Sequence, residues 1–303
     1  MPIASVVSAS GGAGKTTLAL LLGYYVATHA GDPRSVLLVD LDPTAGLSLR
    51  AFGDEGYVEL CRKRRSLYHL DLDWTQGVAV DVDKYAERPG PAAPAISNVA
   101  ILPPGEDESG DMASRVDDWF RYGDRERLLR LLKESHALEK YKYVIVDTAP
   151  FFDVRYSIAA IAASNVVLIP LRPTVTDLVR TKRMVEKLKK AGITNKPILF
   201  IFNYDKDKLR QATATLVKLG FYVYKHGGTA QVQKRLMALI EDLGRYGQFA
   251  KAVLPHIKQL SDSEFPANKI PEGDLYTCPA MAEIFRHLAP DKTPDCPAHY
   301  EEE

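Results

Sequence analysis

The sequence predicts an α/β protein whose doubly wound, mostly parallel sheet carries helices on both faces. Short β-branched and apolar runs alternate with helix-length segments along most of the chain, an order typical of strand–helix–strand units. Several runs are apolar throughout rather than alternating, as in parallel strands that are buried on both faces. The first run leads through the glycine-rich stretch SASGGAGKTT, residues 8–17, into a helical segment, and we expect these three parts to open the sheet.

The individual elements follow from these patterns. Seven β-branched runs predict strands, at residues 3–8, 35–40, 98–103, 143–148, 165–170, 197–202 and 251–255. Five intervening segments of helical length predict helices, at residues 15–30, 124–139, 175–191, 207–219 and 229–245. The stretch 278–290 has a helical pattern as well.

Two regions depart from this alternation. Residues 53–97 contain the basic run RKRR at 62–65 and the Pro/Ala-rich stretch RPGPAAPA at 88–95. We interpret them as an insertion at the sheet edge within a single domain that spans 1–290. The last residues, 291–303, are polar, contain two prolines and end in three glutamates, a composition that predicts a disordered tail.

Composition indicates an ordinary globular chain. Of 303 residues, 46% are hydrophobic and 26% charged, and Lys plus Arg and Asp plus Glu both number 39, so net charge indicates no class of partner. The cysteines, Cys61, Cys278 and Cys296, are far apart and form no C-x-x-C. This spacing argues against a zinc site or a disulfide scaffold and favours a cytoplasmic location. We expect no transmembrane helix and no signal peptide, because the chain has neither a long apolar run nor an N-terminal basic segment.

The glycine-rich stretch is a candidate phosphate-binding loop. Glycines allow backbone N–H groups to approach phosphates, and the following helix N-terminus adds partial positive charge. In such a P-loop, Lys15 would reach the β- and γ-phosphates and the Thr16 hydroxyl would bind Mg²⁺. Ala9 stands where the usual pattern has its first glycine. The predicted nucleotide-binding residues of this loop are Gly11, Gly12, Ala13, Gly14, Lys15, Thr16 and Thr17.

Acidic residues follow two other predicted strands. Asp40 and Asp42 end the stretch VLLVDLD, and Asp147 ends YKYVIVD. The carboxyl ends of parallel strands meet at the edge of the sheet where such folds bind ligands. We therefore expect the three carboxylates to lie near Lys15, with Asp147 holding Mg²⁺ directly or through water.

Together these motifs resemble the ParA/MinD family of P-loop ATPases, in the SIMIBI class of P-loop NTPases. The family carries K-G-G-x-G-K-T-T, V-D-x-D-P-Q-G and I-I-D-T-P-P, and this chain has SGGAGKTT at 10–17, VDLDPTAG at 39–46 and VIVDTAP at 144–150. Three further segments are similar to family motifs: NVVLIPLRPTVTDL at 165–178, FIFNYDKD at 200–207 and AVLPHIKQLSDSE at 252–264.

The resemblance implies Mg²⁺-dependent hydrolysis of ATP. Lys15 would contact the phosphates, and Thr16 and Asp147 would hold the metal. Asp42 would orient the attacking water, and Asp40 would support the waters on the metal. Catalysis of this kind depends mainly on positioning and on neutralising charge around the γ-phosphate.

The resemblance also implies an adenine site and a cation that acts across a dimer. Asn203 and Pro255 would bracket the adenine. In the family, the first lysine of the loop reaches the partner's phosphates, but this chain has Ser10 there, as does the McdA branch, which takes its phosphate-contacting lysine from later in the chain. We expect slow hydrolysis in isolation or a substitute cation, for which the candidates are Arg155, Arg172, Arg180, Lys182 and Arg183.

A basic segment favours DNA as a partner. Residues 180–225 contain twelve Lys or Arg and three Asp or Glu, a net charge of +9, as sequence-independent DNA binding requires. Lys187, Lys189 and Lys190 are the candidate DNA contacts, and the run 62–65 is the competing site. A membrane partner is not expected, because the last helical stretch precedes an acidic tail that anionic lipid would repel.

Two classes of function stay open at this point. The first is a ParA-type ATPase that dimerises with ATP, binds duplex DNA without sequence preference and is stimulated by a ParB-like or McdB-like adaptor on its cargo: a plasmid, a chromosome or a protein microcompartment. Such a protein would be cytoplasmic and nucleoid-associated when ATP is bound. The alternatives are a P-loop metallochaperone or biosynthetic ATPase of related fold and a MinD-like positioning ATPase.

Overall fold

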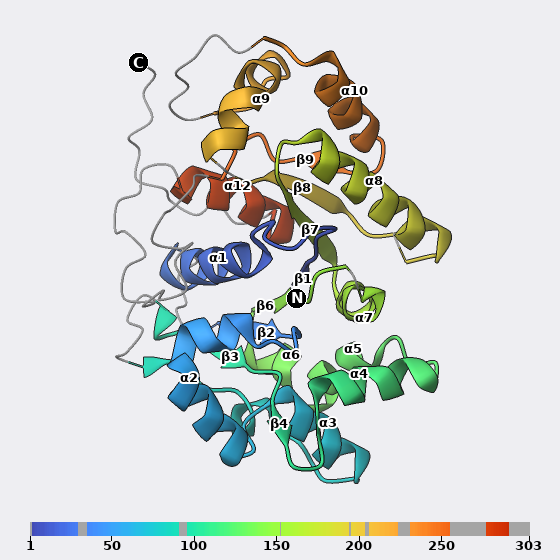
Figure 1. Cartoon of the computed structure of the whole chain (residues 1–303). Helices are drawn as coiled ribbons and strands as arrows, with labels where there is room; N and C mark the ends of the chain where they lie inside the picture. Colours follow the sequence, from blue (N-terminus) through green and yellow to red (C-terminus); the bar gives the residue numbers. More distant parts are fainter. Residues whose placement is uncertain are drawn as a thin grey trace.

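The computed structural model describes residues 2–29, 35–90, 96–151, 153–193, 195–203, 206–223, 231–254 and 277–290, with the backbone alone at 206–209 and 277–279. Its main sheet has seven strands: β1 (Ile3–Val6), β2 (Val36–Asp40), β3 (Ala100–Leu102), β6 (Tyr143–Asp147), β7 (Val166–Leu171), β8 (Ile198–Phe202) and β9 (Gln248–Phe249). Their order is β3-β2-β6-β1-β7-β8-β9, and all neighbours are parallel (Figure 1). The strands β4 (Glu106–Asp107) and β5 (Gly110–Asp111) form a small antiparallel pair.

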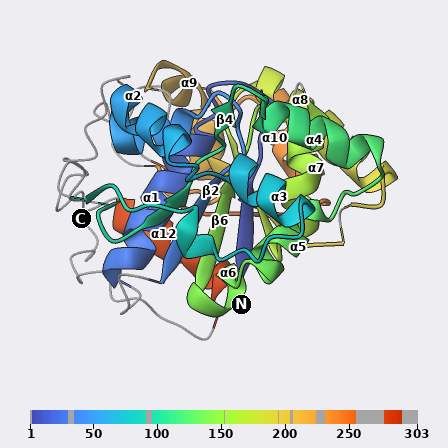
Figure 2. The same ribbon diagram turned by 90° about the horizontal axis from the view of Figure 1, so that it is seen from below.

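Helices follow or separate most of the strands. They are α1 (Lys15–His29), α2 (Gly46–Arg62), α3 (Leu67–Thr75), α4 (Met112–Arg121), α5 (Arg127–Glu134), α6 (Ala137–Lys140), α7 (Val154–Ala163), α8 (Val175–Lys190), α9 (Lys206–Lys218), α10 (Lys234–Leu243) and α12 (Thr277–Leu288), with the 3₁₀ turn η1 (Val82–Lys84). In the view from below, α1 and α12 lie on one side of the sheet and α7 and α8 on the other (Figure 2). The predicted doubly wound α/β fold is confirmed. No helix among the described residues has the length and apolar character needed to cross a bilayer.

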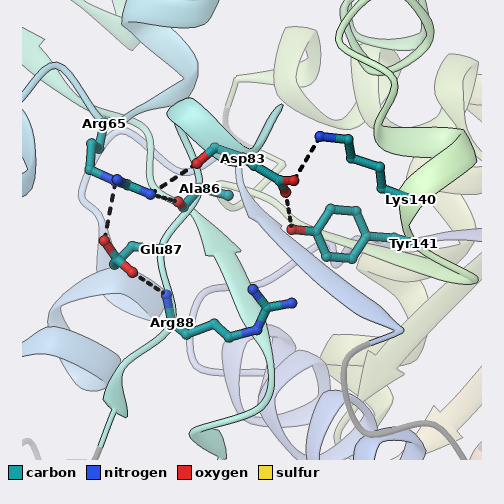
Figure 3. Close-up of a pocket in the computed structure, with 7 residues that line it drawn as sticks. All are labelled: Arg65, Asp83, Ala86, Glu87, Arg88, Lys140 and Tyr141. Atoms are coloured by element: carbon teal, nitrogen blue, oxygen red, sulfur yellow. Dashed lines mark hydrogen bonds and ion pairs between the residues drawn. The ribbon is translucent and has the colours of Figure 1, made fainter. Parts of the chain in front are cut away.

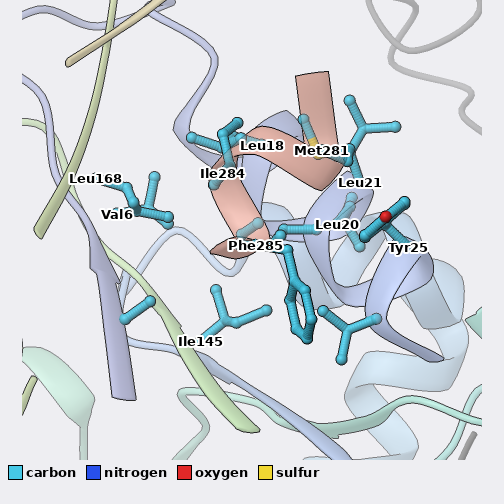
Figure 4. Packing of buried hydrophobic residues seen from close by; sticks show 14 of the residues in the cluster. Val6, Leu18, Leu20, Leu21, Tyr25, Ile145, Leu168, Met281, Ile284 and Phe285 are labelled. Carbon is cyan, nitrogen blue, oxygen red and sulfur yellow. The ribbon is translucent and has the colours of Figure 1, made fainter. Parts of the chain in front are cut away.

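Alternate residues of each strand enter opposite cores. Leu38 packs with α1, α2 and α12, whereas Leu37 and Val39 pack with α3, α4, α5 and α7. In the first core, Phe285 of α12 makes edge contact with Tyr25 of α1 at a ring-centroid distance of 6.1 Å (Figure 4). Because both faces are covered, most residues of the central strands are apolar, as the sequence pattern predicted.

The first six predicted strands are confirmed, but the seventh was misplaced. The last strand of the sheet is Gln248–Phe249, which pairs with β8 through Leu199 and Phe200. The following residues form only isolated parallel bridges, Ala252 with Tyr222 and Leu254 with Asn203. A continuous ladder cannot form over 251–254, because these residues alternate between two different neighbours. Pro255, at the end of the predicted strand, lies outside the described residues.

The helix predicted over 124–139 is divided in the structure. Its residues contribute α5 and α6, and His136 between them has a φ of 58°. A residue in this left-handed region ends the regular helix. A separate helix, α4, precedes them and is capped by Asp111, whose side chain accepts a hydrogen bond from the Ser114 N–H at 2.8 Å.

The predicted insertion, 53–97, is largely helical and packs on the sheet. It contributes the end of α2, then α3 and η1. Leu67, Leu70 and Val82 share a core with Leu37 and Val39 of β2. Since this segment is part of a sheet-face core, a single domain over 1–290 remains our interpretation. The predicted tail, 291–303, lies outside the described residues.

Candidate functional site

The glycine-rich loop connects β1 to α1 at the carboxyl edge of the sheet (Figure 1). Gly12 and Gly14 have φ values of 67° and 91°, a region that favours glycine. Gly14 is also close-packed, because a Cβ atom there would lie 2.0 Å from Nδ2 of Asn203. The same amide nitrogen donates to the Ala13 carbonyl at 3.0 Å. The loop thus depends on glycine at two positions, and the asparagine directly after β8 is hydrogen-bonded to it.

Lys15 is the buried cation of this loop. Lys15 is the first residue of α1, and the residue is 6% exposed. Burial lowers the pKa of Lys15, while the charges of Asp147 and Asp42 act in the opposite direction. An ammonium group in this position is costly unless anions surround it. A polyphosphate bound to the loop would supply those anions.

Asp40 and Asp147 are buried neighbours at the ends of adjacent strands. They lie opposite each other in the pairing of β2 with β6, and both are fully buried. Asp147 accepts a 2.6 Å hydrogen bond from the Thr16 hydroxyl. Asp40 accepts from the N–H and the hydroxyl of Ser48 at 2.9 and 2.7 Å. Burial raises the pKa of both carboxyl groups; Lys15 and the Thr16 hydrogen bond oppose the shift at Asp147, and the Ser48 hydrogen bonds oppose it at Asp40.

This arrangement fits a magnesium ion that is completed by phosphate and water oxygens. The described residues contain no group of three or more His, Cys, Asp or Glu side chains that could hold a metal alone. Mg²⁺ usually takes one or two carboxylates and keeps phosphate oxygens and waters as its other ligands. Asp147, the adjacent Thr16 hydroxyl and the neighbouring Asp40 supply this type of oxygen donor, and a divalent cation would offset the two buried carboxylates.

Asp42 lies in the loop between β2 and α2 and is half-buried. Its Oδ1 accepts hydrogen bonds from the N–H and hydroxyl of Thr44, at 3.0 and 2.8 Å. Its backbone N–H donates to Asp40 Oδ1 at 3.2 Å. One carboxylate oxygen of Asp42 is therefore held by Thr44. The backbone of this loop is in turn held by the carboxylate of Asp40.

Ser10 joins the loop to the segment after β7. Its buried hydroxyl donates to Asp177 Oδ1 at 3.1 Å. Asp177 is also the acceptor for Arg172, whose Nε and Nη2 lie 2.6 and 3.2 Å from its oxygens. Of the candidate cations, Arg172 is thus tied to the loop through Asp177, whereas Arg180 and Arg183 are exposed along α8.

Two other candidate cations are held elsewhere. Arg155 forms ion pairs with Asp153, which precedes its helix, and with Asp117 of α4. Lys182 forms an ion pair with Asp242 of α10 at 2.5 Å. Neither has a hydrogen bond or an ion pair to the loop within the described part of the chain.

The two candidate DNA surfaces differ in how their charges are paired. Lys187, Lys189 and Lys190 are exposed at the end of α8, and within the described ranges none forms an ion pair with an acidic side chain. In the competing run, Arg62 and Lys63 pair with Glu59, Arg64 with Asp73 and Arg65 with Glu87. The α8 lysines therefore offer more uncompensated positive charge.

A polar cavity of about 340 Å³ lies away from the glycine-rich loop. Arg65, Asp83, Ala86, Glu87, Arg88, Lys140 and Tyr141 line it (Figure 3). Its polar groups contact one another: the Lys140 ammonium and the Tyr141 hydroxyl donate to the Asp83 carboxylate at 2.7 and 3.1 Å. None of the predicted nucleotide or metal residues lines this cavity.

The matching family model, described as an AAA domain, covers residues 1–200. The sporulation initiation inhibitor protein Soj of Bacillus subtilis is 28% identical over 195 residues, 61% of this chain and 66% of its own. The maintenance of carboxysome distribution protein A of Gloeothece citriformis is 26% identical over 67% of this chain and 70% of its own. The chain belongs to the ParA/MinD family of P-loop ATPases.

Solved structures of the ParA/MinD fold superpose on nearly the whole length of this chain. The apo McdA structure from Cyanothece matches with a TM-score of 0.66 and 21% identity, covering 95% of this chain and 99% of its own. Structures of the same fold have been solved with ATP, for a McdA variant, and with Mg-ADP, for the septum site-determining protein MinD of Pyrococcus horikoshii.

Sequence analysis did not single out Ser48 and Asp177 of this ParA/MinD family chain. Asp177 stands three residues after Thr174, whose hydroxyl accepts from the Asp177 N–H at 3.2 Å. From the sequence, this spacing indicates only a helix start. It gives no sign that the Asp177 side chain also accepts a hydrogen bond from Ser10. The position of Ser48 two residues into α2 carries no sequence signal that links it to Asp40.

Proposed function

We propose that this chain is a positioning ATPase whose ATP-bound dimer binds DNA without sequence preference and is stimulated by an adaptor on its cargo. The observation that carries the proposal is the convergence of Lys15, Thr16, Asp40, Asp42 and Asp147 at one edge of the sheet. The relatives named above include a carboxysome-distribution protein, which supports positioning over biosynthesis.

The roles that we propose within the site are those that the resemblance to the family implies. Lys15 would bind the β- and γ-phosphates, and Thr16 and Asp147 would hold Mg²⁺, which neutralises phosphate charge when bound. Asp42 would orient the water that attacks the γ-phosphate. Asp40 would fix the loop that carries Asp42, to which it is hydrogen-bonded.

Among the candidate cations, we propose Arg172 as the one that acts on the partner's phosphates. It is held within two hydrogen bonds of Ser10 through Asp177, and Ser10 occupies the position of the family's lysine. An arginine finger of this type can raise turnover by several orders of magnitude. Since it would act only in a dimer, basal hydrolysis should be slow.

Asn203 and Pro255 remain the proposed adenine neighbours. The Asn203 amide contacts the phosphate loop through the Ala13 carbonyl, so we propose that it supports the loop as well as the base. Pro255 lies beyond the residues that the structure describes.

ATP should convert the monomer into a dimer. The Asp42→Ala variant keeps ATP intact, so its mass by light scattering should be close to 33.6 kDa with ADP and about twice that with ATP. The Lys15→Ala variant, tested alongside, should stay at the monomer mass in both nucleotides. Equal mass for Asp42→Ala with ATP and ADP would contradict the nucleotide switch.

The exposed lysines at the end of α8 should carry the DNA contacts. Reversing Lys187, Lys189 and Lys190 to glutamate should weaken binding of the ATP-bound dimer to unrelated duplexes and leave ATP affinity unchanged. Each lost phosphate contact flattens the log–log salt dependence by about 0.9, so two protomers could lose up to about 5. Filter binding at a series of salt concentrations measures this slope.

The matched control is reversal of Arg62 and Lys63, which pair with Glu59 and should contribute little. If the control and not the α8 variant loses binding, the DNA surface is wrongly assigned. If the ATP-loaded wild type binds no duplex near 100 mM salt, where the screening length is about 10 Å, the metallochaperone or biosynthetic alternative gains support. A MinD-like protein would instead bind vesicles containing anionic lipid.

A further inference from the structure

An arginine from α2 lies against the phosphate loop. Arg50 is half-buried, and its Nη1 donates to the Thr17 hydroxyl oxygen at 3.3 Å. Thr17 is the third residue of α1, directly after Lys15 and Thr16. The contact therefore brings a second cation, from a different helix, to the helix N-terminus at which phosphates are expected to bind.

The charge of Arg50 has no carboxylate partner in the described part of the chain. Asp147 attracts it at longer range, and burial lowers the pKa of its guanidinium, although an arginine stays protonated in proteins. Arg62 at the other end of the same helix is exposed and pairs with Glu59. A half-buried guanidinium without such a partner is unfavourable by itself, and a bound anion would remove this cost.

The Thr17 hydroxyl can link this cation to an anion. A hydroxyl carries one donor and two acceptor positions, and Arg50 occupies an acceptor position. The proton of Thr17 therefore remains able to point at a phosphate oxygen. The guanidinium has further N–H groups in its planar fork, which could reach the same phosphate group.

We propose that Arg50, positioned by its hydrogen bond to the Thr17 hydroxyl, binds the α-phosphate of the nucleotide, an inference that rests on the proposed nucleotide binding. The loop backbone cradles the α- and β-phosphates, the lysine reaches the β- and γ-phosphates and the preceding threonine holds the metal. In this chain those positions are Lys15 and Thr16. The α-phosphate is then contacted by backbone groups and lacks a cationic side chain, which Arg50 beside Thr17 would supply. Arg50 supplies a positive charge within the same protomer.

Binding of ADP and of ATP to Arg50→Gln tests this assignment. Isothermal titration with Mg²⁺ would be carried out in the Asp42→Ala background, so that ATP is not consumed. The Kd for ADP and the Kd for ATP should rise by the same factor, about tenfold or more, since a hydrogen bond to a charged group is lost. Arg50→Lys should recover part of the loss, and Arg62→Gln on the same helix should bind within about twofold of the parent.

Two results would overturn the role of Arg50 while leaving the proposed function intact: unchanged affinity of Arg50→Gln for ADP, or a loss confined to ATP, which would place the arginine at the γ-phosphate. Equal unfolding midpoints of Arg50→Gln and Arg62→Gln without nucleotide exclude misfolding as the cause. A wild-type protein that binds neither nucleotide would overturn the proposed function itself.

Discussion

Replacing Asp42 with alanine is expected to leave ATP bound and to reduce its hydrolysis by at least about a hundredfold. Asp42 has one carboxylate oxygen fixed by Thr44, and its charge acts on Lys15. We propose that it orients a water at the terminal phosphate, a role whose loss costs turnover and not binding. Phosphate release at saturating ATP measures the effect, with ATP affinity determined in parallel.

Asp54→Ala is the matched control for this prediction. Asp54 is exposed on α2, twelve residues further along the chain, and its removal should leave turnover within about twofold of wild type, as for most surface substitutions. Hydrolysis by Asp42→Ala at the wild-type rate would show that another residue orients the water.

Replacing Lys15 with alanine is expected to abolish nucleotide binding, raising the Kd for ATP by about a hundredfold or more. The lysine is buried and feels the charges of Asp147 and Asp42, and a hundredfold loss corresponds to about 2.7 kcal/mol. Because burying an ammonium group is unfavourable, the variant should fold with a thermal midpoint no lower than that of the wild type. Equilibrium binding and thermal unfolding measure the two effects.

The exposed Lys133 on α5 provides the control, since Lys133→Ala removes the same charge away from the loop. If Lys15→Ala binds ATP as well as Lys133→Ala does, the loop does not hold the phosphates through this lysine.

The first six strands were predictable because burial on both faces makes most of their residues apolar, as in YVIV at 143–146, directly before Asp147. Several helices were not. The helix α2 contains Gly53, with a φ of 72°, and Gly56, and glycines lower helix propensity. The helix α7 reads VRYSIAAIAA and has few charged residues to mark a polar face. These helices form because tertiary packing outweighs a weak local preference.

The site was predictable where residues are fixed by their place in an element. Lys15 begins a helix, and Asp40 and Asp147 end strands. Contacts between elements were not predictable from local pattern. Ser10 is hydrogen-bonded to Asp177, 167 positions away in the sequence, and Arg50 is hydrogen-bonded to Thr17, 33 positions away. Such pairs depend on how α2 and the segment after β7 are positioned by the sheet.

The parallel order of the sheet has a consequence for folding of the chain while the ribosome synthesises it. The strand β1 is made first, yet its neighbours begin at Tyr143 and Val166, and Ile3 pairs with Val144. At about 5–20 residues per second, a ribosome needs roughly 7–30 s to supply the first of these partners. During that interval the apolar strand cannot complete its native hydrogen bonds. Early chaperone contact with the nascent chain is therefore expected to favour the first thirty residues over the later strand β8, whose partners β7 and β9 are its neighbours in the chain.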